Sequence, residues 1–202
     1  MKEILSKAEQ ERQFCYAYDL AFRNVNKRKN WHNIFVLWLS AARQSHKRAQ
    51  FYAGTCYNHG LGVKKDIGEA FKWFMKAAKQ GHMESQYNIG FFFLEGELVK
   101  RDLKKGVEWF KLSAKKGFIE AQRDLGYCYF YGKGVRQDLF KAVYWYRKAA
   151  AKDDSKALYN LRLCYKHGEG VHQSIRWARH YFEKAGRLGY KNAERQLRTI
   201  VD

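Results

Sequence analysis

The chain has 202 residues and a formal net charge of +19, and 17% of its residues are aromatic. Aromatic side chains on this scale exclude an intrinsically disordered chain, which lacks the apolar surface needed for a core. Proline is absent, and this favours helices joined by glycine turns over proline-marked loops.

Residues 1–48 are predicted to form a degenerate N-terminal capping unit. Ala41 and Ala42 lie 36 residues before Ala77 and Ala78, which belong to a pattern that is complete only further along the chain. Terminal units of a repeat array differ from internal ones because their outer faces meet water instead of a neighbour. We therefore interpret this segment as a degenerate first repeat of an array.

The N-terminal sequence also bears on localisation. It contains no apolar run of signal-peptide length. The longest strongly apolar run in the chain, residues 34–39, is far too short to span a bilayer. We expect a cytoplasmic protein with no membrane span.

The central part of the chain is predicted to form four repeats of 36 residues without insertions, namely 49–84, 85–120, 121–156 and 157–192. Glycine, aspartate and aromatic positions carry the period. Three of the series are Gly60, Gly96, Gly132 and Gly168; Asp66, Asp102, Asp138 and Ser174; and Trp73, Trp109, Trp145 and Tyr181. A fixed period of this length indicates a solenoid of stacked helical units. Residues 193–202 are predicted to add a C-terminal capping helix.

Each repeat is predicted to contain two helices joined by a glycine turn. The second helix begins at the repeated aspartate, which can accept hydrogen bonds from unpaired backbone amides. Its buried side is expected to carry the tryptophan series, so Trp109 and Trp145 are predicted to be core residues. Glycine inside the first helix, as at Gly54 and Gly126, costs about 1 kcal/mol relative to alanine, and close helix packing would explain it. The last repeat has Arg162 at that position.

The third repeat carries the clearest family resemblance. Its first helix, AQRDLGYCY over residues 121–129, is followed by Gly-Lys-Gly-Val at 132–135 and by KAVYWYRKAA over 141–150. This pattern resembles the Sel1-like repeat, a relative of the tetratricopeptide repeat. The resemblance implies an all-α fold, a right-handed α/α superhelical solenoid of helix-turn-helix repeats. It also implies an adaptor, scaffold or inhibitor that binds other proteins.

Cys56, Cys128 and Cys164 occupy one repeat position. One branch of the Sel1-like family is stapled by disulfides. Equivalent positions in stacked helical repeats lie about 8–10 Å apart, however, beyond the roughly 7 Å limit between bridged Cα atoms. We expect buried, reduced thiols and a reducing compartment.

No set of residues has the spacing of a catalytic or metal-binding motif. The seven histidines form no H-E-x-x-H pair, and the Gly-x-Gly turns lack the lysine of a P-loop. The repeated aspartates are explained as helix caps. The sequence therefore predicts no catalytic residue, no metal and no cofactor, and the chain is not expected to be an enzyme.

By analogy with tetratricopeptide arrays, the first helices would line a concave groove, and helical spacing selects the side chains that face it. The selected residues are Phe51, Thr55 and Asn58; Tyr87, Phe91 and Leu94; Arg123, Tyr127, Phe130 and Tyr131; and Tyr159, Leu163, Lys166 and His167. Aromatic residues and arginine dominate binding hot spots, so these residues are predicted to bind a partner. Phe91, Tyr127, Phe130 and Tyr131 are expected to be exposed. Phe51, Tyr87 and Tyr159 fit exposure and packing between neighbouring first helices equally well.

The leading functional prediction is a non-catalytic protein–protein interaction module, such as an adaptor, a scaffold or an immunity protein, that acts as a monomer. The basic residues are spread along the chain, and they either keep the surface solvated or favour an acidic protein or peptide as the partner. RNA binding through the basic surface is the alternative. Thr55, Phe91, Tyr127 and Leu163 share one groove position but show no base-reading code.

Overall fold

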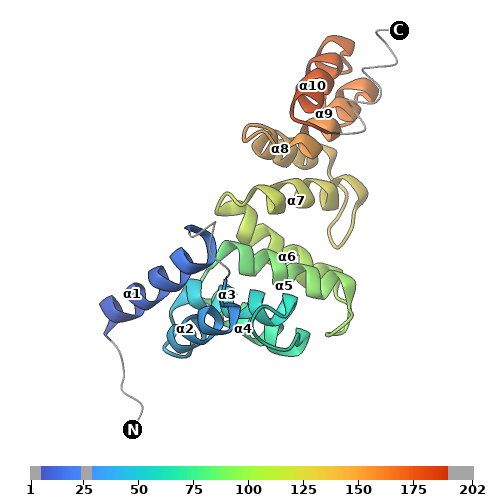
Figure 1. The fold of residues 1–202 in the computed structure, drawn as a ribbon. Helices are drawn as coiled ribbons and strands as arrows, with labels where there is room; N and C mark the ends of the chain where they lie inside the picture. Colours follow the sequence, from blue (N-terminus) through green and yellow to red (C-terminus); the bar gives the residue numbers. More distant parts are fainter. Residues whose placement is uncertain (1–5, 24–28, 191–202) are drawn as a thin grey trace. The chain divides into compact units, whose positions relative to one another are not determined.

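The computed structural model describes residues 6–23 and 29–190, and every regular element in this part of the chain is a helix (Figure 1). The elements are α1 (Lys7–Tyr18), the π-helical segment η1 (Asp19–Arg23), α2 (Trp31–Arg43), α3 (Lys47–His59), α4 (Ile67–Lys79), α5 (Met83–Glu95), α6 (Leu103–Lys115), α7 (Ile119–Tyr131), α8 (Leu139–Ala150), α9 (Ser155–His167) and α10 (Ile175–Arg187). The predicted all-α helical-repeat fold is confirmed. None of these helices is long and apolar enough to cross a membrane. The predicted helix over 193–202 lies outside the described residues.

The chain divides into two compact units, Met1–Arg101 with α1 to α5 and Asp102–Asp202 with α6 to α10. The boundary falls inside the second predicted repeat, between its two helices. Within the units, the helices that pack most closely are consecutive pairs, such as α3 with α4, α7 with α8 and α9 with α10. The helix pair predicted for each repeat is therefore the structural element from which the units are built.

The second helix of each repeat begins at the predicted cap. The side chains of Asp66, Asp102 and Asp138 each accept a hydrogen bond from the backbone amide three residues later, at 2.9 Å in all three cases. Ser174 makes the equivalent bond at 3.4 Å. These caps satisfy amide groups that have no partner inside the helix. The first helices end at four glycines in the left-handed conformation: Gly60, Gly96, Gly132 and Gly168.

A glycine inside the first helix lets the second helix of the same repeat approach closely. A Cβ atom added at Gly54 would lie 2.7 Å from the ring of Phe74, and one added at Gly126 would lie 2.7 Å from the ring of Tyr146. These distances are well below van der Waals contact, and both rings are buried. The close packing predicted from the helical glycines is confirmed at these two positions.

In the last repeat an arginine, and not a glycine, contacts the aromatic ring of the second helix. Arg162 replaces the glycine, and its guanidinium carbon lies 4.6 Å from the centroid of the Phe182 ring. Phe182 follows Tyr146 by 36 residues. The ring that would have rested on glycine is therefore covered by a planar cation, which favours aromatic faces. Leu161, next to the arginine, is fully buried.

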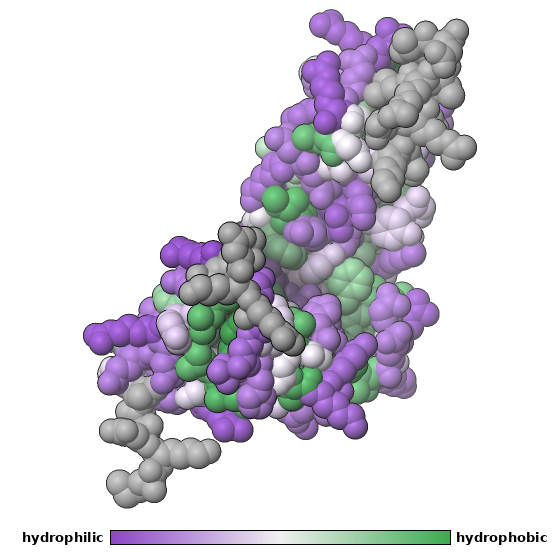
Figure 2. Space-filling model, in the orientation of Figure 1, coloured by the Kyte–Doolittle hydropathy of each residue, from purple (hydrophilic) through white to green (hydrophobic). Residues whose placement is uncertain are grey.

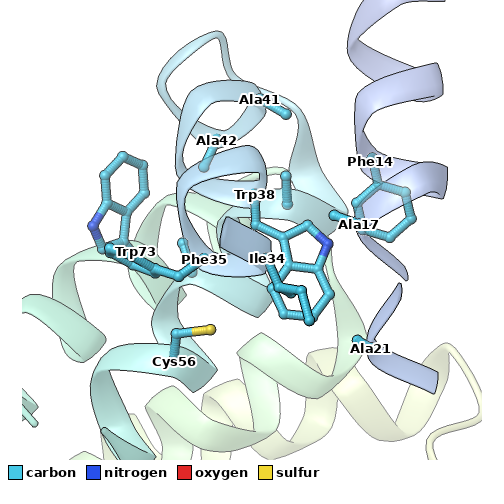
Figure 3. Close-up of a cluster of buried hydrophobic side chains, with 12 residues drawn as sticks. Phe14, Ala17, Ala21, Ile34, Phe35, Trp38, Ala41, Ala42, Cys56 and Trp73 are labelled. Carbon is cyan, nitrogen blue, oxygen red and sulfur yellow. The ribbon is translucent and has the colours of Figure 1, made fainter. Parts of the chain in front are cut away.

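The core of the first unit begins before the first complete repeat. Phe14 of α1 and Ala21 of η1 are buried in one cluster with Ile34 and Trp38 of α2 (Figure 3). Trp38 also stacks on Tyr52 of α3, with ring centroids 4.6 Å apart. Aromatic packing thus joins the N-terminal helices to the first repeat. The capping role of residues 1–48 stays a prediction.

A buried glutamine links each of three repeats to the one before it, a feature that was missed in the sequence. The Nε2 atoms of Gln50, Gln86 and Gln122 donate to the carbonyl oxygens of Ala42, Ala78 and Ala114 at 3.1–3.2 Å. Each acceptor lies at or near the end of the preceding second helix, where backbone carbonyls lack partners within the helix. The glutamines therefore cap one helix from the next. In the last repeat this position is Leu158.

The predicted core role of Trp109 and Trp145 is wrong, because both side chains are only half-buried. The residue that follows each of them is the buried one, and Tyr146 is only 2% exposed. Two aromatic side chains adjacent in a helix point about 100° apart, so only one of them can rest on the glycine of the first helix. The buried ring is the one that rests on the glycine of the first helix, as at Phe74 and Tyr146. Trp73, the first tryptophan of the series, is also buried as predicted, beside Phe74.

We expect Tyr146→Ala to lower the free energy of unfolding by about 3–5 kcal/mol, as a large-to-small substitution in a packed core. Trp145→Ala should cost clearly less, because that ring is half-buried. Urea unfolding of the two variants, followed by circular dichroism, compares adjacent residues of one helix. Equal losses would contradict the assignment of the buried face.

We also expect Gly126→Ala to destabilise the protein. Alanine gains about 1 kcal/mol in helix propensity, but forcing a carbon against the Tyr146 ring costs about 1–3 kcal/mol. Gly68→Ala in α4 is the matched control, because an added Cβ there meets only a carboxylate oxygen of Asp66, at 3.3 Å. Thermal melting should show a lower midpoint for Gly126→Ala alone. A stabilised Gly126→Ala protein would show that the ring moves away at no cost.

Candidate functional site

Two surface pockets lie between successive first helices, one in each unit. The α3–α5 pocket has a volume of about 370 Å³ and is lined by Phe51, Thr55, Asn58, His59, Phe74, Asn88, Phe91, Phe92, Glu95 and Glu97. The α7–α9 pocket has a volume of about 360 Å³ and is lined by Tyr127, Phe130, Tyr131, Tyr146, Asn160, Leu163, His167 and Glu169. Every residue of the second set follows a member of the first set by 72 residues, which is two repeats. The same pocket is therefore built twice.

The repeat itself explains how each pocket is built. One wall comes from the first helix of a repeat and the other from the first helix of the next repeat. The buried rings that rest on the helical glycines, Phe74 and Tyr146, also line the pockets. A pocket therefore needs two consecutive repeats, and its depth depends on how closely the helices of one repeat pack.

Nine of the predicted partner-binding residues line these pockets. Seven of them are Phe51, Thr55, Asn58 and Phe91 in the first unit and Tyr127, Phe130 and Tyr131 in the second. Phe91, Tyr127 and Tyr131 have exposed rings, as expected for a binding surface. Phe130 is half-buried, so its predicted exposure is only partial. Leu163 and His167 also line the α7–α9 pocket.

The Phe51 ring packs between repeats. It stacks on His82 with centroids 4.7 Å apart, and His82 is the N-cap of α5, the first helix of the next repeat. Tyr159, at the same repeat position, lies 4.8 Å from Tyr190, which follows it by 31 residues as His82 follows Phe51. Of the two alternatives, packing between neighbouring repeats thus describes Phe51, although Phe51 also borders its pocket.

Arg123 occupies the same repeat position and contacts the next repeat through charge. Its guanidinium lies 2.7 Å from a carboxylate oxygen of Asp124 and 3.3 Å from one of Asp154, and its side chain is 15% exposed. Asp154 is in turn the N-cap of α9 and follows Arg123 by 31 residues. The arginine therefore holds two repeats together, and little of it is left for a partner.

Three other predicted residues line neither the α3–α5 nor the α7–α9 pocket. Tyr87 is half-buried, with its ring edge-on to Phe91 at 4.8 Å. Leu94 is half-buried and Lys166 is exposed. The two share a repeat position with Asn58 and Phe130, which do line pockets, but nothing in the structure gives them the same role.

The prediction missed one polar contributor to both pockets. Asn88 of α5 and Asn160 of α9 are half-buried and lie at one repeat position. An asparagine amide can both donate and accept hydrogen bonds, so it suits a peptide backbone. The signal was present in the sequence, because Asn88 stands polar among the aromatic and aliphatic residues of α5. On this helix, projection from the core glycine selected Tyr87, Phe91 and Leu94 and passed over Asn88.

The basic charge of the chain does not lie in the pockets. The α3–α5 pocket includes Glu95 and Glu97 but no Lys or Arg. Most of the helical cations lie on the second helices instead. For example, α8 contains Lys141, Arg147 and Lys148 and no carboxylate, whereas α5 contains two glutamates and no Lys or Arg. On the face drawn in Figure 2, hydrophilic side chains surround smaller apolar areas.

Polar groups at the pockets make contacts within the protein. The Thr55 hydroxyl donates to the Phe51 carbonyl of its own helix at 3.0 Å. Lys133 donates to the Tyr127 hydroxyl at 3.1 Å, and its ammonium lies 4.7 Å from the ring centroid. Among residues 6–23 and 29–190, no group of three or more His, Cys, Asp or Glu side chains could hold a metal ion.

All four cysteines are free. Cys56, Cys128 and Cys164 are buried, and burial raises the pKa of each of these thiols to about 12. Cys15 is exposed, and its pKa is raised by partial burial and by its hydrogen bond to Glu11. Because the thiolate is the nucleophile, the three buried groups are chemically quiet at neutral pH.

The comparisons with known proteins agree with this architecture. The family model described as Sel1 repeat matches residues 47–82, 84–118, 119–154 and 155–190. A solved Sel1 repeat protein from Oxalobacter formigenes is 31% identical, with a TM-score of 0.86 over 95% of this chain and 78% of that one. None of the curated proteins matches the sequence.

Two further solved structures resemble the chain. A protective antigen of uropathogenic Escherichia coli strains is 28% identical, with a TM-score of 0.84 over 93% of this chain, which spans only 40% of that protein. An immunity protein from Pseudomonas aeruginosa is 20% identical, with a TM-score of 0.59 over 96% of this chain and 69% of that one. The second likeness is one of fold alone.

We expect native protein at pH 8 to take up alkylating reagent at one cysteine. Cys15 should react because it is exposed, whereas the other three are buried with a pKa of about 12. Iodoacetamide labelling followed by mass spectrometry should give one adduct in native protein and four after denaturation. Rapid labelling of Cys56, Cys128 or Cys164 would contradict their burial, and a Cys15→Ser variant should remove the single native adduct.

Proposed function

The chain belongs to the Sel1 repeat family, and we propose that it is a non-catalytic protein–protein interaction module whose partner binds at the first-helix pockets. The observation that carries the proposal is the duplicated pocket. Two equivalent pockets with exposed aromatic walls and a half-buried asparagine are what repeated contacts along one partner require. An adaptor, a scaffold or an immunity protein works by occupying a surface, and each needs a preformed site of this kind.

The pocket chemistry suits an extended polypeptide segment. Apolar side chains of the partner would rest against Phe91, Tyr127 and Tyr131, which supply large contact areas at low conformational cost. Asn88 and Asn160 would pair with backbone amide and carbonyl groups of the segment. Because Glu95 and Glu97 line the α3–α5 pocket, the part of the partner bound there is neutral or basic. The acidity predicted for the partner therefore has no counterpart in this pocket.

The buried thiols are consistent with a reducing compartment, and we place the protein there. Free cysteines persist where glutathione and thioredoxin keep them reduced, as in the cytoplasm. The proposed role needs no disulfide, because helix packing alone holds the pocket walls.

We expect Phe91→Ala and Tyr127→Ala each to weaken partner binding by about 2 kcal/mol or more, as truncations of aromatic anchors. The full chain would be used to capture partners from native lysate, and the strongest candidate would be titrated against each variant. Tyr16→Ala is the matched control, because Tyr16 is an exposed tyrosine of α1 that lines neither pocket. Affinity unchanged in both pocket variants would contradict the proposal.

The same titration at two salt concentrations separates protein binding from the RNA alternative. RNA would use the cation-rich second helices, and each neutralised phosphate would add to the salt dependence of the affinity. A protein held by the pockets should show a weak salt dependence together with a large effect of Tyr127→Ala. A steep salt dependence with no effect of Tyr127→Ala would indicate nucleic acid instead.

A further inference from the structure

The outer face of α8 carries two aromatic side chains where the other repeats carry polar residues or glycine. Phe140 is 78% exposed and Tyr144 is 50% exposed. The residues at the Phe140 position in the other repeats are Gly68, Lys104 and Arg176, and those at the Tyr144 position are Lys72, Glu108 and His180. The other repeats show that this face of the fold does not need aromatic residues. Their presence in the third repeat calls for a reason other than packing.

A pocket lies at these two rings. Phe140, Val143 and Tyr144 line it together with Arg147, Lys148 and Gly170, and its volume is about 370 Å³. Gly170 belongs to the turn before α10, and it approaches so closely that an added Cβ would lie 2.3 Å from the Leu139 carbonyl oxygen. Both walls are therefore held by backbone contact within the second unit. The pocket has room for one large apolar side chain.

The charges at this pocket have a single sign. Arg147 and Lys148 are exposed, and neither forms an ion pair among the described residues. Arg147 donates to the Tyr165 hydroxyl at 2.6 Å, which fixes its side chain without neutralising it. Lys141, the remaining cation of α8, pairs with Asp138 at 2.8 Å. Two positive charges thus remain uncompensated at an apolar pocket.

The arrangement favours a protein segment over a nucleic acid. The Lys148 ammonium lies 4.9 Å from the centroid of the Tyr144 ring and 5.4 Å from that of Trp145. A base that stacked on the covered face of Tyr144 would have to displace this cation, whereas a carboxylate would be attracted to it. A side-chain-sized pocket is also a poor match for the phosphate backbone but a good one for an aromatic or leucine anchor.

We propose that the α8 face, comprising Phe140, Tyr144, Arg147 and Lys148, is a second docking surface that binds an acidic protein segment. One large apolar side chain of that segment fills the pocket, and neighbouring Asp or Glu residues face Arg147 and Lys148. This surface is separate from the first-helix pockets and does not depend on the function proposed for them. An acidic segment bound at the α8 face would neutralise basic residues of a second helix, whereas a segment bound in the first-helix pockets would not contact them.

The residues that another repeat has at these two positions provide a test variant that the fold accommodates. Phe140→Lys combined with Tyr144→Glu gives α8 the residues that α6 has at the same positions, Lys104 and Glu108. The double variant leaves the net charge unchanged, but its new glutamate can pair with Arg147 as Glu108 pairs with Lys111 at 2.7 Å. Phe140→Ala combined with Tyr144→Ala is therefore measured beside it, because this variant removes the rings without adding a charge. Lys148→Glu tests the charge separately. Tyr127→Ala is the control for the first-helix pockets, and circular dichroism establishes that each variant is folded.

The probe is a library of random 16-residue peptides displayed on phage, selected on the full chain and counter-selected on the double variant. We expect the enriched peptides to carry Asp or Glu around one Trp, Phe or Leu. They should bind Phe140→Lys/Tyr144→Glu and Lys148→Glu about tenfold more weakly or worse, and Tyr127→Ala as well as the wild type.

Three outcomes would overturn the proposal. The first is that no peptide distinguishes the wild type from the double variant. The second is that the distinguishing peptides are not acidic. The third is that a 20-residue single-stranded RNA binds the wild type and loses affinity in the double variant, which would make the α8 face a nucleic-acid site. Loss of binding in Tyr127→Ala instead would assign the selected peptides to the first-helix pockets.

Discussion

The contact between a glycine in the first helix and an aromatic ring in the second sets how closely the two helices of a repeat can lie. At Gly54 and Gly126 an added carbon would overlap the ring of Phe74 or Tyr146. The same two rings line the pockets on the first-helix side. A single packing contact thus stabilises the repeat and shapes the pocket beside it, and a change in one would alter the other.

The two helices of a repeat carry different chemistry to solvent. The pockets between first helices are lined by aromatic residues, asparagine and carboxylates, as the α3–α5 pocket shows. The second helix α8 presents lysine and arginine together with exposed aromatic rings. The net charge alone suggested an acidic partner for an aromatic groove, because it says nothing about where the basic residues lie. In the structure neither first-helix pocket is lined by a lysine or an arginine, so the charge and the aromatic pockets have to be explained separately.

The period predicted most of the architecture, because each repeat makes the same local choices. The caps at Asp66, Asp102 and Asp138 and the close packing at the helical glycines followed from residue type and spacing. The spacing did not predict which of Trp145 and Tyr146 is buried. Both are large aromatic residues, and only the position of the facing helix determines which ring packs against it. Helical projection put Arg123 at the groove, but it lines neither pocket. Its ion pairs with Asp124 and Asp154 depend on a residue 31 positions away, which projection along one helix does not reveal.

The glutamine contacts show how one repeat is joined to the next. Gln50, Gln86 and Gln122 each hold a first helix to the end of the preceding second helix. Leu158 has no amide to donate, so the last repeat is joined by apolar packing at that position. Two arginines supply its polar links instead: Arg123 pairs with Asp154 at 3.3 Å, and Arg147 donates to the Tyr165 hydroxyl at 2.6 Å. The junction between repeats can therefore be rebuilt from other residue types, and the loss of one recurring contact does not by itself separate two repeats.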